Sequence, residues 1–145
     1  MLQHRVIGIH SALVPSTIES VVTQLLYLQM ESPKEEITIH INSSGANVIE
    51  KGHQHSFDLQ AFAIVDMILT TSCPVRTICV GEASGFAALV LSLGRNGSRF
   101  SLPNSRISFH QQRSTLEGRS YDIAAIANYL SVSRFKVLNL LSQVS

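Results

Sequence analysis

The sequence predicts an α/β fold in which mostly parallel strands alternate with helices. Two patterns carry this prediction: short β-rich segments with apolar residues at every second position, and longer segments with apolar residues at helical spacing. The two kinds of segment alternate along the 145 residues, which is typical of a parallel sheet with right-handed crossovers. The length suits a single domain, residues 1–145.

The chain is expected to begin with a strand, a helix and a second strand. The segments "RVIGI" (residues 5–9) and "ITIHI" (residues 37–41) are the strands, and the second alternates as a half-buried strand does. Residues 15–30 form the predicted helix, which has capping-box spacing at Ser16 and Glu19 and ends before Pro33. Its expected apolar stripe is Ile18, Val21, Val22, Leu25 and Leu26.

A polar, glycine-containing loop of about 16 residues is predicted next, "NSSGANVIEKGHQHSF" (residues 42–57). Loops of this length are uncommon in compact domains and are often functional or inserted. Its first part, "NSSGAN", is either an anion-binding turn or an ordinary turn after a strand, since it lacks phosphate-loop spacing. The H-x-H pair of His53 and His55 fits metal binding or a solvated loop, and no carboxylate or cysteine cluster supports a metal.

The second half continues the alternation. A helix over residues 58–71, with Asp58 as its N-cap, precedes the strand "PVRTICV". The stretch "CVGEASGFAALVLSLG" (residues 79–94) then runs from a strand end into a helix that is apolar on nearly every side and so is expected to be buried, with Gly94 capping its end. An Asn-Gly turn, two short strands around Pro103-Asn104 and a long apolar helix over residues 120–142 complete the prediction.

Composition excludes several classes of function. The chain is 45% hydrophobic and 14% charged, with a net charge of +1, so nothing points to nucleic acid or to a membrane surface. No apolar run reaches the roughly 18 residues that span a bilayer. Cys73 and Cys79 match no zinc or redox spacing and are expected to be buried, reduced thiols. No cofactor and no metal site are predicted.

Ser84 and His110 are the candidate catalytic residues. A turn between a strand and a helix presents its residue beside free helix N–H groups, and acyl-transfer enzymes place a serine nucleophile there. The sequence "GEASG" does not match G-x-S-x-G, so Ser84 is either the N-cap of the buried helix or a nucleophile. His110, at the end of "RISFH", is either a general base or a polar residue where a strand ends.

Several stretches together resemble the proteolytic subunit of the Clp protease family, whose fold is shared with the crotonases. The chain has "INSSGA" where the family has "INSPGG", "GEASGFAA" where it has "GQAASMGA", and "FSLPNSRISFHQQ" where it has "FCLPNSR…HQP". The opening "HRVIG…TQLLYLQMESP" is also similar, and residues 120–142 correspond to the family's long handle helix. The resemblance therefore covers nearly the whole chain and implies the fold of an ATP-dependent serine peptidase subunit.

The departures from the family imply that the active site is not intact. Aligned without gaps from Gly81, the family's nucleophilic serine falls on Gly85, and its neighbouring oxyanion-hole residue falls on Phe86. Ser84 precedes the nucleophile position by one residue, which turns a side chain by about 100° at a helix start. The second oxyanion donor falls on Ala46, which would be strained if that position needs a positive φ.

The other two triad positions are also defined by the resemblance. His110 matches the family's catalytic histidine, and the catalytic aspartate is expected beyond residue 145, because Asp122 falls at the start of the handle helix. The axial loop is likewise expected before Met1, so the chain is expected to be part of a longer protein. A loop about nine residues longer than the family's, "EKGHQHSFD" (residues 50–58), has no counterpart in the family's pattern.

These departures resemble the catalytically inactive ClpR-type subunits. The resemblance implies a structural subunit that completes a heptameric ring with other ClpP or ClpR subunits, stacks through the handle helix and meets an AAA+ unfoldase. It implies the plastid stroma, with the cyanobacterial cytoplasm as the alternative. Two other functions stay open: an active serine endopeptidase subunit that uses Ser84 and His110, and a crotonase-like acyl-CoA enzyme that uses backbone N–H donors alone.

Overall fold

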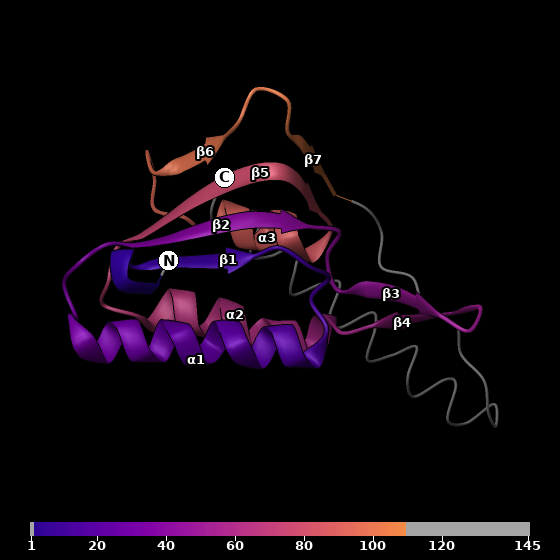
Figure 1. The fold of residues 1–145 in the computed structure, drawn as a ribbon, viewed down its shortest axis with the longest axis horizontal. Coiled ribbons are helices and arrows are strands. Elements are labelled where there is room, and N and C mark those ends of the chain that lie inside the picture. The colour runs from indigo at the N-terminus through magenta and orange to yellow at the C-terminus, as the bar shows by residue number, and fades with distance from the viewer. Residues whose placement is uncertain (1, 110–145) are drawn as a thin grey trace.

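The computed structural model describes residues 2–109 and shows the predicted alternation of strands and helices (Figure 1). His110 and the predicted handle helix lie outside the described residues. The elements are η1 (Leu2–His4), β1 (Val6–Ile9), α1 (Pro15–Glu31), β2 (Ile37–Ser43), β3 (Asn47–Glu50), β4 (His53–Ser56), α2 (Asp58–Thr70), β5 (Val75–Ser84), α3 (Phe86–Ser92), β6 (Arg99–Ser101) and β7 (Arg106–Ser108).

One parallel sheet organises the described part of the chain. Its strand order is β1-β2-β5-β6, and β7 also pairs with β5. Strand β6 pairs with the first half of β5, where Thr77 lies opposite Arg99, and β7 pairs with the second half, where Ser84 lies opposite Ser108. All of these pairs are parallel, as predicted. The carboxyl ends of β2, β5 and β7 therefore meet at one edge of the sheet.

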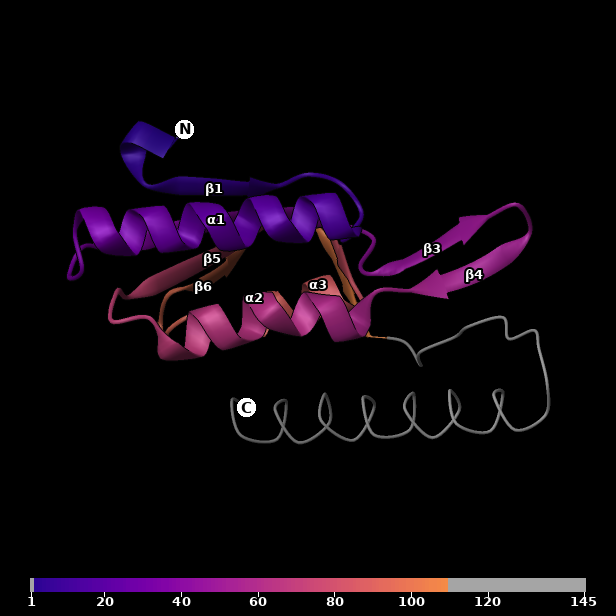
Figure 2. The ribbon, with the colours of Figure 1, turned by 90° about the horizontal axis from the view of Figure 1, so that it is seen from below.

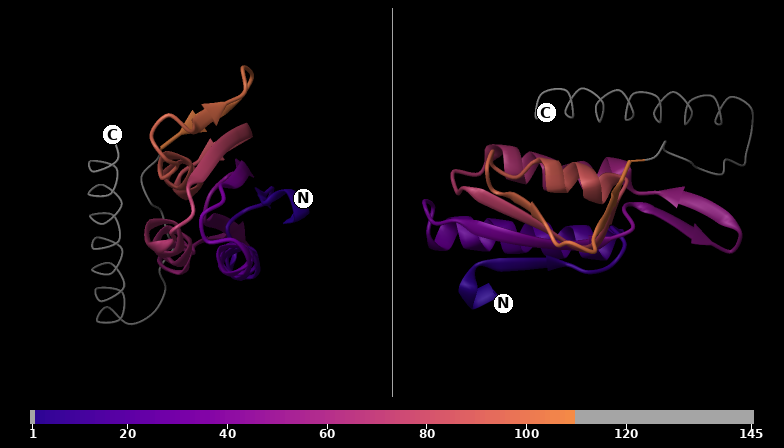
Figure 3. Two further views of the ribbon diagram at one scale, coloured as in Figure 1. Left: turned by 90° about the vertical axis from the view of Figure 1, so that its left-hand side faces the viewer. Right: turned by 90° about the horizontal axis from the view of Figure 1, so that it is seen from above.

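The three helices lie on one side of the strands, as the end-on view of Figure 3 shows. Helices α1 and α2 run side by side (Figure 2) and lie below the sheet in the view of Figure 1. The core forms between the two layers because each strand turns every second side chain toward the helices. The inward side chains of the sheet include Ile7, Ile9, Ile37, Ile39, Ile41 and Cys79, none of them more than 1% exposed.

The buried stripe of α1 differs from the prediction at three positions: Leu26 is exposed, Val22 is only partly buried, and Leu28, which was not predicted, is buried. Ile18, Val21, Leu25 and Leu28 are buried, which is the spacing i, i+3, i+7, i+10 of one helix face. Leu26 is 48% exposed, because it lies one residue beyond Leu25 and so points about 100° away from the core. The prediction that α3 is buried is confirmed, since every residue from Phe86 to Leu91 is buried.

The predicted helix caps are wrong at three helices. Helix α1 has Pro15 at its first position and Val14 as N-cap without a side-chain cap, so Ser16 and Glu19 form no capping box; proline suits this first position because its missing N–H has no helical acceptor. Asp58 is the first residue of α2, after the N-cap Phe57. Gly94 has no positive φ; a Cβ there would collide with Thr77 and Arg99, so close packing is what requires glycine.

The segment predicted as a long loop contains a hairpin. Strands β3 and β4 pair antiparallel, from Asn47 opposite Ser56 to Glu50 opposite His53, and Figure 1 shows them projecting beyond the sheet. Lys51 and Gly52 connect them with φ of +52° and +80°, the two positive values that a type I′ turn requires. The hairpin was not predicted because glycine and polar residues are typical of loops. The segments "VIE" and "HQHS" are nevertheless each long enough for a strand.

Candidate active site

The candidate active site lies where β5 ends and α3 begins. Gly85 is the N-cap of α3, with φ of +59° and ψ of −122°. Such a backbone conformation is unfavourable for residues with a Cβ. It is the sharp strand-to-helix turn on which hydrolases expose a nucleophile. We call this strand-to-helix turn the elbow, and residue 85 is its tip.

Ser84 lies one residue before the elbow tip and is still part of β5. Its side chain is buried, with the residue 6% exposed. The hydroxyl donates to Glu82 Oε1 at 2.6 Å and shares a hydrogen bond of 3.0 Å with Ser108 Oγ. The interpretation of Ser84 as the N-cap of α3 is thus wrong, because Gly85 occupies that position and Ser84 bridges β5 and β7.

The loop after β2 packs directly against the elbow. Gly45 has φ of +96°, and a Cβ built on it would lie 2.6 Å from the Ser84 carbonyl oxygen and 3.3 Å from the Phe86 nitrogen. Only glycine allows this approach. Its neighbour Ala46 is buried and has no positive φ, so the strain that we considered for Ala46 is absent and the left-handed conformation falls on Gly45.

Ala46 and Phe86 can offer only their backbone to this site. The Phe86 ring is buried and meets Phe62 edge-on at 5.2 Å, so it packs toward α2. Neither N–H donates to a backbone carbonyl in the loops and turns of residues 2–109. The structure therefore brings Ser84, Gly85, Ala46 and Phe86 together, whereas His110 lies outside the described residues.

Three residues that the sequence did not single out shape the end of β5. The β2–β5 ladder shifts register after Ile41, where the Asn42 side chain accepts a hydrogen bond from the Glu82 N–H at 3.3 Å. Gly81 has φ of +95° and donates to Ser105 Oγ, which in turn donates to the Cys79 carbonyl. These side chains replace ladder hydrogen bonds and let β5 continue to Ser84.

Glu82 and Ser108 were also missed, although a signal for them exists. Glu82 and Ser84 are two residues apart on one strand and so share a face. Ser108 precedes His110 by two residues in the alternating "RISFH". Besides its side-chain contact with Ser84, its carbonyl accepts the Gly85 N–H at 2.9 Å. Strand β7 is therefore fixed to the elbow immediately before the segment that carries His110.

The described residues contain no cluster of three or more histidine, cysteine or acidic side chains that could hold a metal. Cys73 and Cys79 are free and buried, as predicted. Burial raises the pKa of the Cys79 thiol, with a smaller opposing effect from Ser105. Among residues 2–109 no helix is long and apolar enough to cross a membrane.

Comparison with known proteins shows the family. The profile of the Clp protease family matches residues 1–145. The chain belongs to the Clp protease family. It is 32% identical over 143 residues to the chloroplastic ATP-dependent Clp protease proteolytic subunit-related protein 4 of Arabidopsis thaliana, covering 99% of this chain and 46% of the relative. It is 38% identical over 122 residues to an ATP-dependent Clp protease proteolytic subunit-like protein of Synechocystis sp., covering 84% and 54%.

Family membership argues against the alternative of a crotonase-like acyl-CoA enzyme, because the matching profile is that of the Clp protease family. The chain spans about half the length of these two curated relatives. The relationship therefore establishes the family and its mixed α/β fold. It makes the elbow at Gly85 the part of this chain to compare with the active site of a protease.

Proposed function

We propose that this chain is a non-catalytic, ClpR-type subunit of an ATP-dependent Clp serine peptidase core. The observation that carries the proposal is the glycine at the elbow tip. Gly85 has the backbone conformation of a nucleophile elbow, φ of +59° and ψ of −122°, but it has no side chain that could attack a carbonyl. A subunit without the nucleophile contributes architecture to the complex instead of peptide hydrolysis.

The environment of Ser84 argues against the alternative of an active subunit. A nucleophilic serine must present its oxygen to substrate and give its proton to a base within about 3 Å. Ser84 is buried, and its proton is directed to Glu82 within the same strand. Its bridge to Ser108 would have to break before the hydroxyl could turn toward the elbow tip.

The proposed partners are other ClpP or ClpR subunits in a heptameric ring and double ring, and an AAA+ unfoldase on the outer face. Support for subunit contacts comes from the β6–β7 edge of the sheet, where Phe100, Leu102, Ile107 and Phe109 are 45–53% exposed. Phe100, Ile107 and Phe109 help line a cavity of about 250 Å³. Apolar sheet edges of this kind are usually covered, either by another segment of the same chain or by a partner.

The proposed location is the plastid stroma, with the cyanobacterial cytoplasm as the alternative. The support is that one relative is named chloroplastic and the other comes from a cyanobacterium. Immunodetection of the chain in stromal fractions of its source cells, or in the cytoplasm of a cyanobacterial source, distinguishes the two locations. Detection in thylakoid membranes after a high-salt wash would contradict both.

The decisive experiment is fluorophosphonate labelling of the assembled complex, with the adducts mapped by peptide mass. We expect adducts on partner subunits and none on this chain. An adduct on Ser84 would overturn the proposal, because it would mean that a serine in β5 can reach the base. Labelling of Ser84→Ala protein alongside the unaltered chain identifies adducts that form elsewhere on it.

The matched gain-of-function variant is Gly85→Ser, which returns a hydroxyl to the elbow tip. We expect fluorophosphonate labelling at position 85 in the assembled complex and a lower melting temperature, because a residue with a Cβ is strained at this φ and ψ by about 1–2 kcal/mol. Labelling that stays absent while the variant still assembles would show that the loss of activity involves more than the nucleophile.

A further inference from the structure

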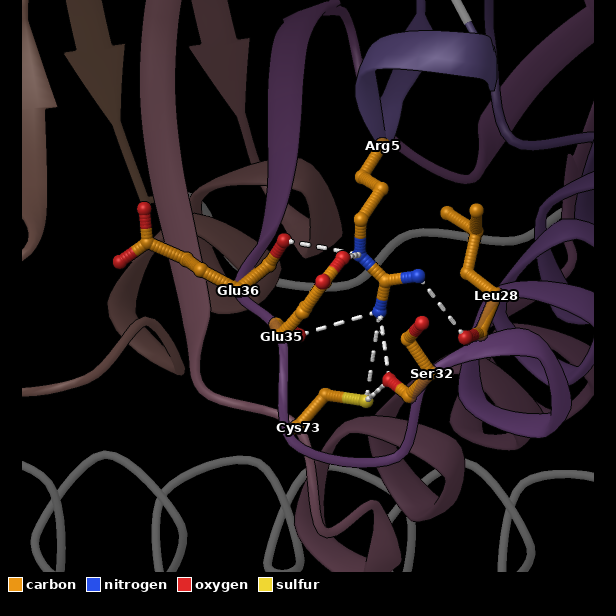
Figure 4. A network of polar contacts seen from close by, with 6 residues as sticks. All are labelled: Arg5, Leu28, Ser32, Glu35, Glu36 and Cys73. Carbon is orange, nitrogen blue, oxygen red and sulfur yellow. Dashed lines mark hydrogen bonds and ion pairs between the residues drawn. The ribbon is translucent and has the colours of Figure 1, made fainter.

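At the end of the sheet opposite the elbow, the side chain of Arg5 donates hydrogen bonds to several backbone carbonyls. Figure 4 shows the Arg5 guanidinium surrounded by acceptors from two distant connections. Its Nε donates to the Glu36 carbonyl at 3.2 Å, and Nη1 donates to the Leu28 carbonyl at 3.1 Å. Nη2 donates to the carbonyls of Ser32 and Glu35, both at 3.0 Å, and lies 3.6 Å from Cys73 Sγ.

These acceptors belong to a helix end that has no cation of its own. Helix α1 carries no basic residue in its last turn, although its final carbonyls have no helical partners and form the negative end of the dipole. Two carbonyls at this end also have backbone donors, since Leu28 accepts the Ser32 N–H and the C-cap residue Ser32 accepts the Glu35 N–H, and the guanidinium is a further donor to both. Arg5, which lies before the first helical residue Pro15 and 23 residues before Leu28, thus provides the positive charge that this helix end lacks and adds hydrogen bonds to its carbonyls.

The backbone of Arg5 is held in an unfavourable conformation. Its φ is +59°, a left-handed value that costs energy for any residue with a Cβ. On either side of it, the Arg5 N–H donates to the Leu2 carbonyl and the Arg5 carbonyl accepts from Thr38. The left-handed turn directs the side chain under β1 toward the connection between α1 and β2, where it is 12% exposed.

We propose that residues 2–5 form a strap whose closed position depends on the Arg5 guanidinium. In the closed position the strap ties the start of β1 to the connection between α1 and β2, residues 32–36, and to Cys73 in the connection before β5. Releasing the guanidinium lets the strap and residues 32–36 open together. The elbow at the other end of the sheet shares none of these hydrogen bonds, so its structure does not change when the strap opens.

The number and direction of the acceptors explain why arginine is needed. A guanidinium has five N–H donors in a rigid plane and can serve four carbonyls from one position, whereas the ammonium of lysine has three donors at a single point. The ion pair with Glu35 contributes little, because its nitrogen–oxygen distance is 3.7 Å and the Glu35 side chain is 67% exposed. The strap is therefore closed by carbonyls and is insensitive to the charge of Glu35.

Hydrogen exchange of the full-length chain, measured by mass spectrometry, tests the strap. Arg5→Gly separates the two contributions of this residue, because glycine relieves the strain at φ of +59° while it removes the guanidinium. We expect exchange of the amides in residues 32–38 to rise about tenfold or more. Peptides covering residues 82–90 should show a smaller rise, no larger than the loss of global stability explains. Arg5→Lys should show the same pattern with a smaller increase.

The controls exclude a general loss of stability. Arg95→Lys, at an exposed arginine outside this network, should leave exchange unchanged throughout. A uniform rise in exchange across the sheet in Arg5→Gly would overturn the proposal, because it would make Arg5 a contributor to global stability only. Unchanged exchange in residues 32–38 would overturn it as well. If Arg5→Gly does not yield folded protein, the local or uniform pattern in Arg5→Lys decides.

Discussion

The two ends of the parallel sheet are fixed by different means. At the amino end, the Arg5 guanidinium donates to four carbonyls from the end of α1 and its connection to β2, which uses nearly all of its N–H groups. At the carboxyl end, Gly45, Gly81 and Gly85 have positive φ values and bring backbone segments close together. The amino end depends on a side chain that any substitution shortens, whereas the carboxyl end depends on the absence of side chains.

This difference indicates what each end of the sheet is for. Hydrogen bonds satisfied by a buried guanidinium stabilise a fixed structure. Glycines that hold a strained turn and leave N–H groups toward a site are typical of positions where chemistry takes place. The carboxyl end therefore has the backbone conformation of a nucleophile elbow, with Gly85 at its tip.

The largest expected effect is that of Gly45→Ala at the carboxyl end. The new Cβ would meet the Ser84 carbonyl oxygen at 2.6 Å and occupy a left-handed backbone position, so we expect the free energy of unfolding to fall by about 3 kcal/mol. Gly52→Ala is the matched control, since Gly52 has φ of +80° and nothing within 4 Å of its Cβ position; it should cost about 1 kcal/mol. Equal effects in urea denaturation would mean that the close approach contributes nothing.

The next effect is that of Arg5→Met at the amino end. Methionine keeps much of the apolar stem and removes every donor, leaving the carbonyls of Leu28, Ser32, Glu35 and Glu36 without the guanidinium. We expect a loss of about 2 kcal/mol in the free energy of unfolding, measured by urea denaturation. A loss smaller than that of the Gly52→Ala control would show that the guanidinium does not fix this end of the sheet.

A smaller effect is expected for Ser84→Ala. The substitution removes the bonds from Ser84 Oγ to Glu82 and Ser108, and partly exposed Glu82 can be hydrated instead. We expect a loss of about 1 kcal/mol, seen as a lower melting temperature. Ser84→Cys retains volume but not the strong hydroxyl donor, so it should resemble alanine. A neutral result for Ser84→Ala would show that the β5–β7 bridge does not stabilise the elbow.

The smallest effect is a pH dependence due to Cys79, midway along β5. Burial raises the pKa of this thiol in the folded chain, so the unfolded chain loses the thiol proton first as the pH rises. The stabilisation is complete below the unfolded pKa and is lost as the pH rises through it toward the folded pKa. Between pH 7 and pH 8.5 we expect a loss of no more than about 0.4 kcal/mol, the limit for a thiol that stays protonated in the folded chain, and none in Cys79→Ala. The same slope in both proteins would assign the dependence to other groups.

The sheet and the buried helix were predictable because their signals are local. Alternation at Ile37, Ile39 and Ile41 gives the face of β2 directly, and the apolar run after Gly85 gives the burial of α3. The position of Ser84 was not predictable, since the strand continues past Gly81 only because Asn42 and Ser105 replace ladder hydrogen bonds across 24 to 40 residues. The role of Arg5 likewise depends on partners 23 to 68 residues away.

The reach of Arg5 also has a consequence for the order in which the protein forms during its synthesis. Arg5 leaves the ribosome before all of its acceptors, and Cys73 follows 68 residues later. At about 5–20 residues per second, this interval is roughly 3 to 14 s. The first strand of the sheet is therefore made seconds before the last of the side-chain contacts that anchor it.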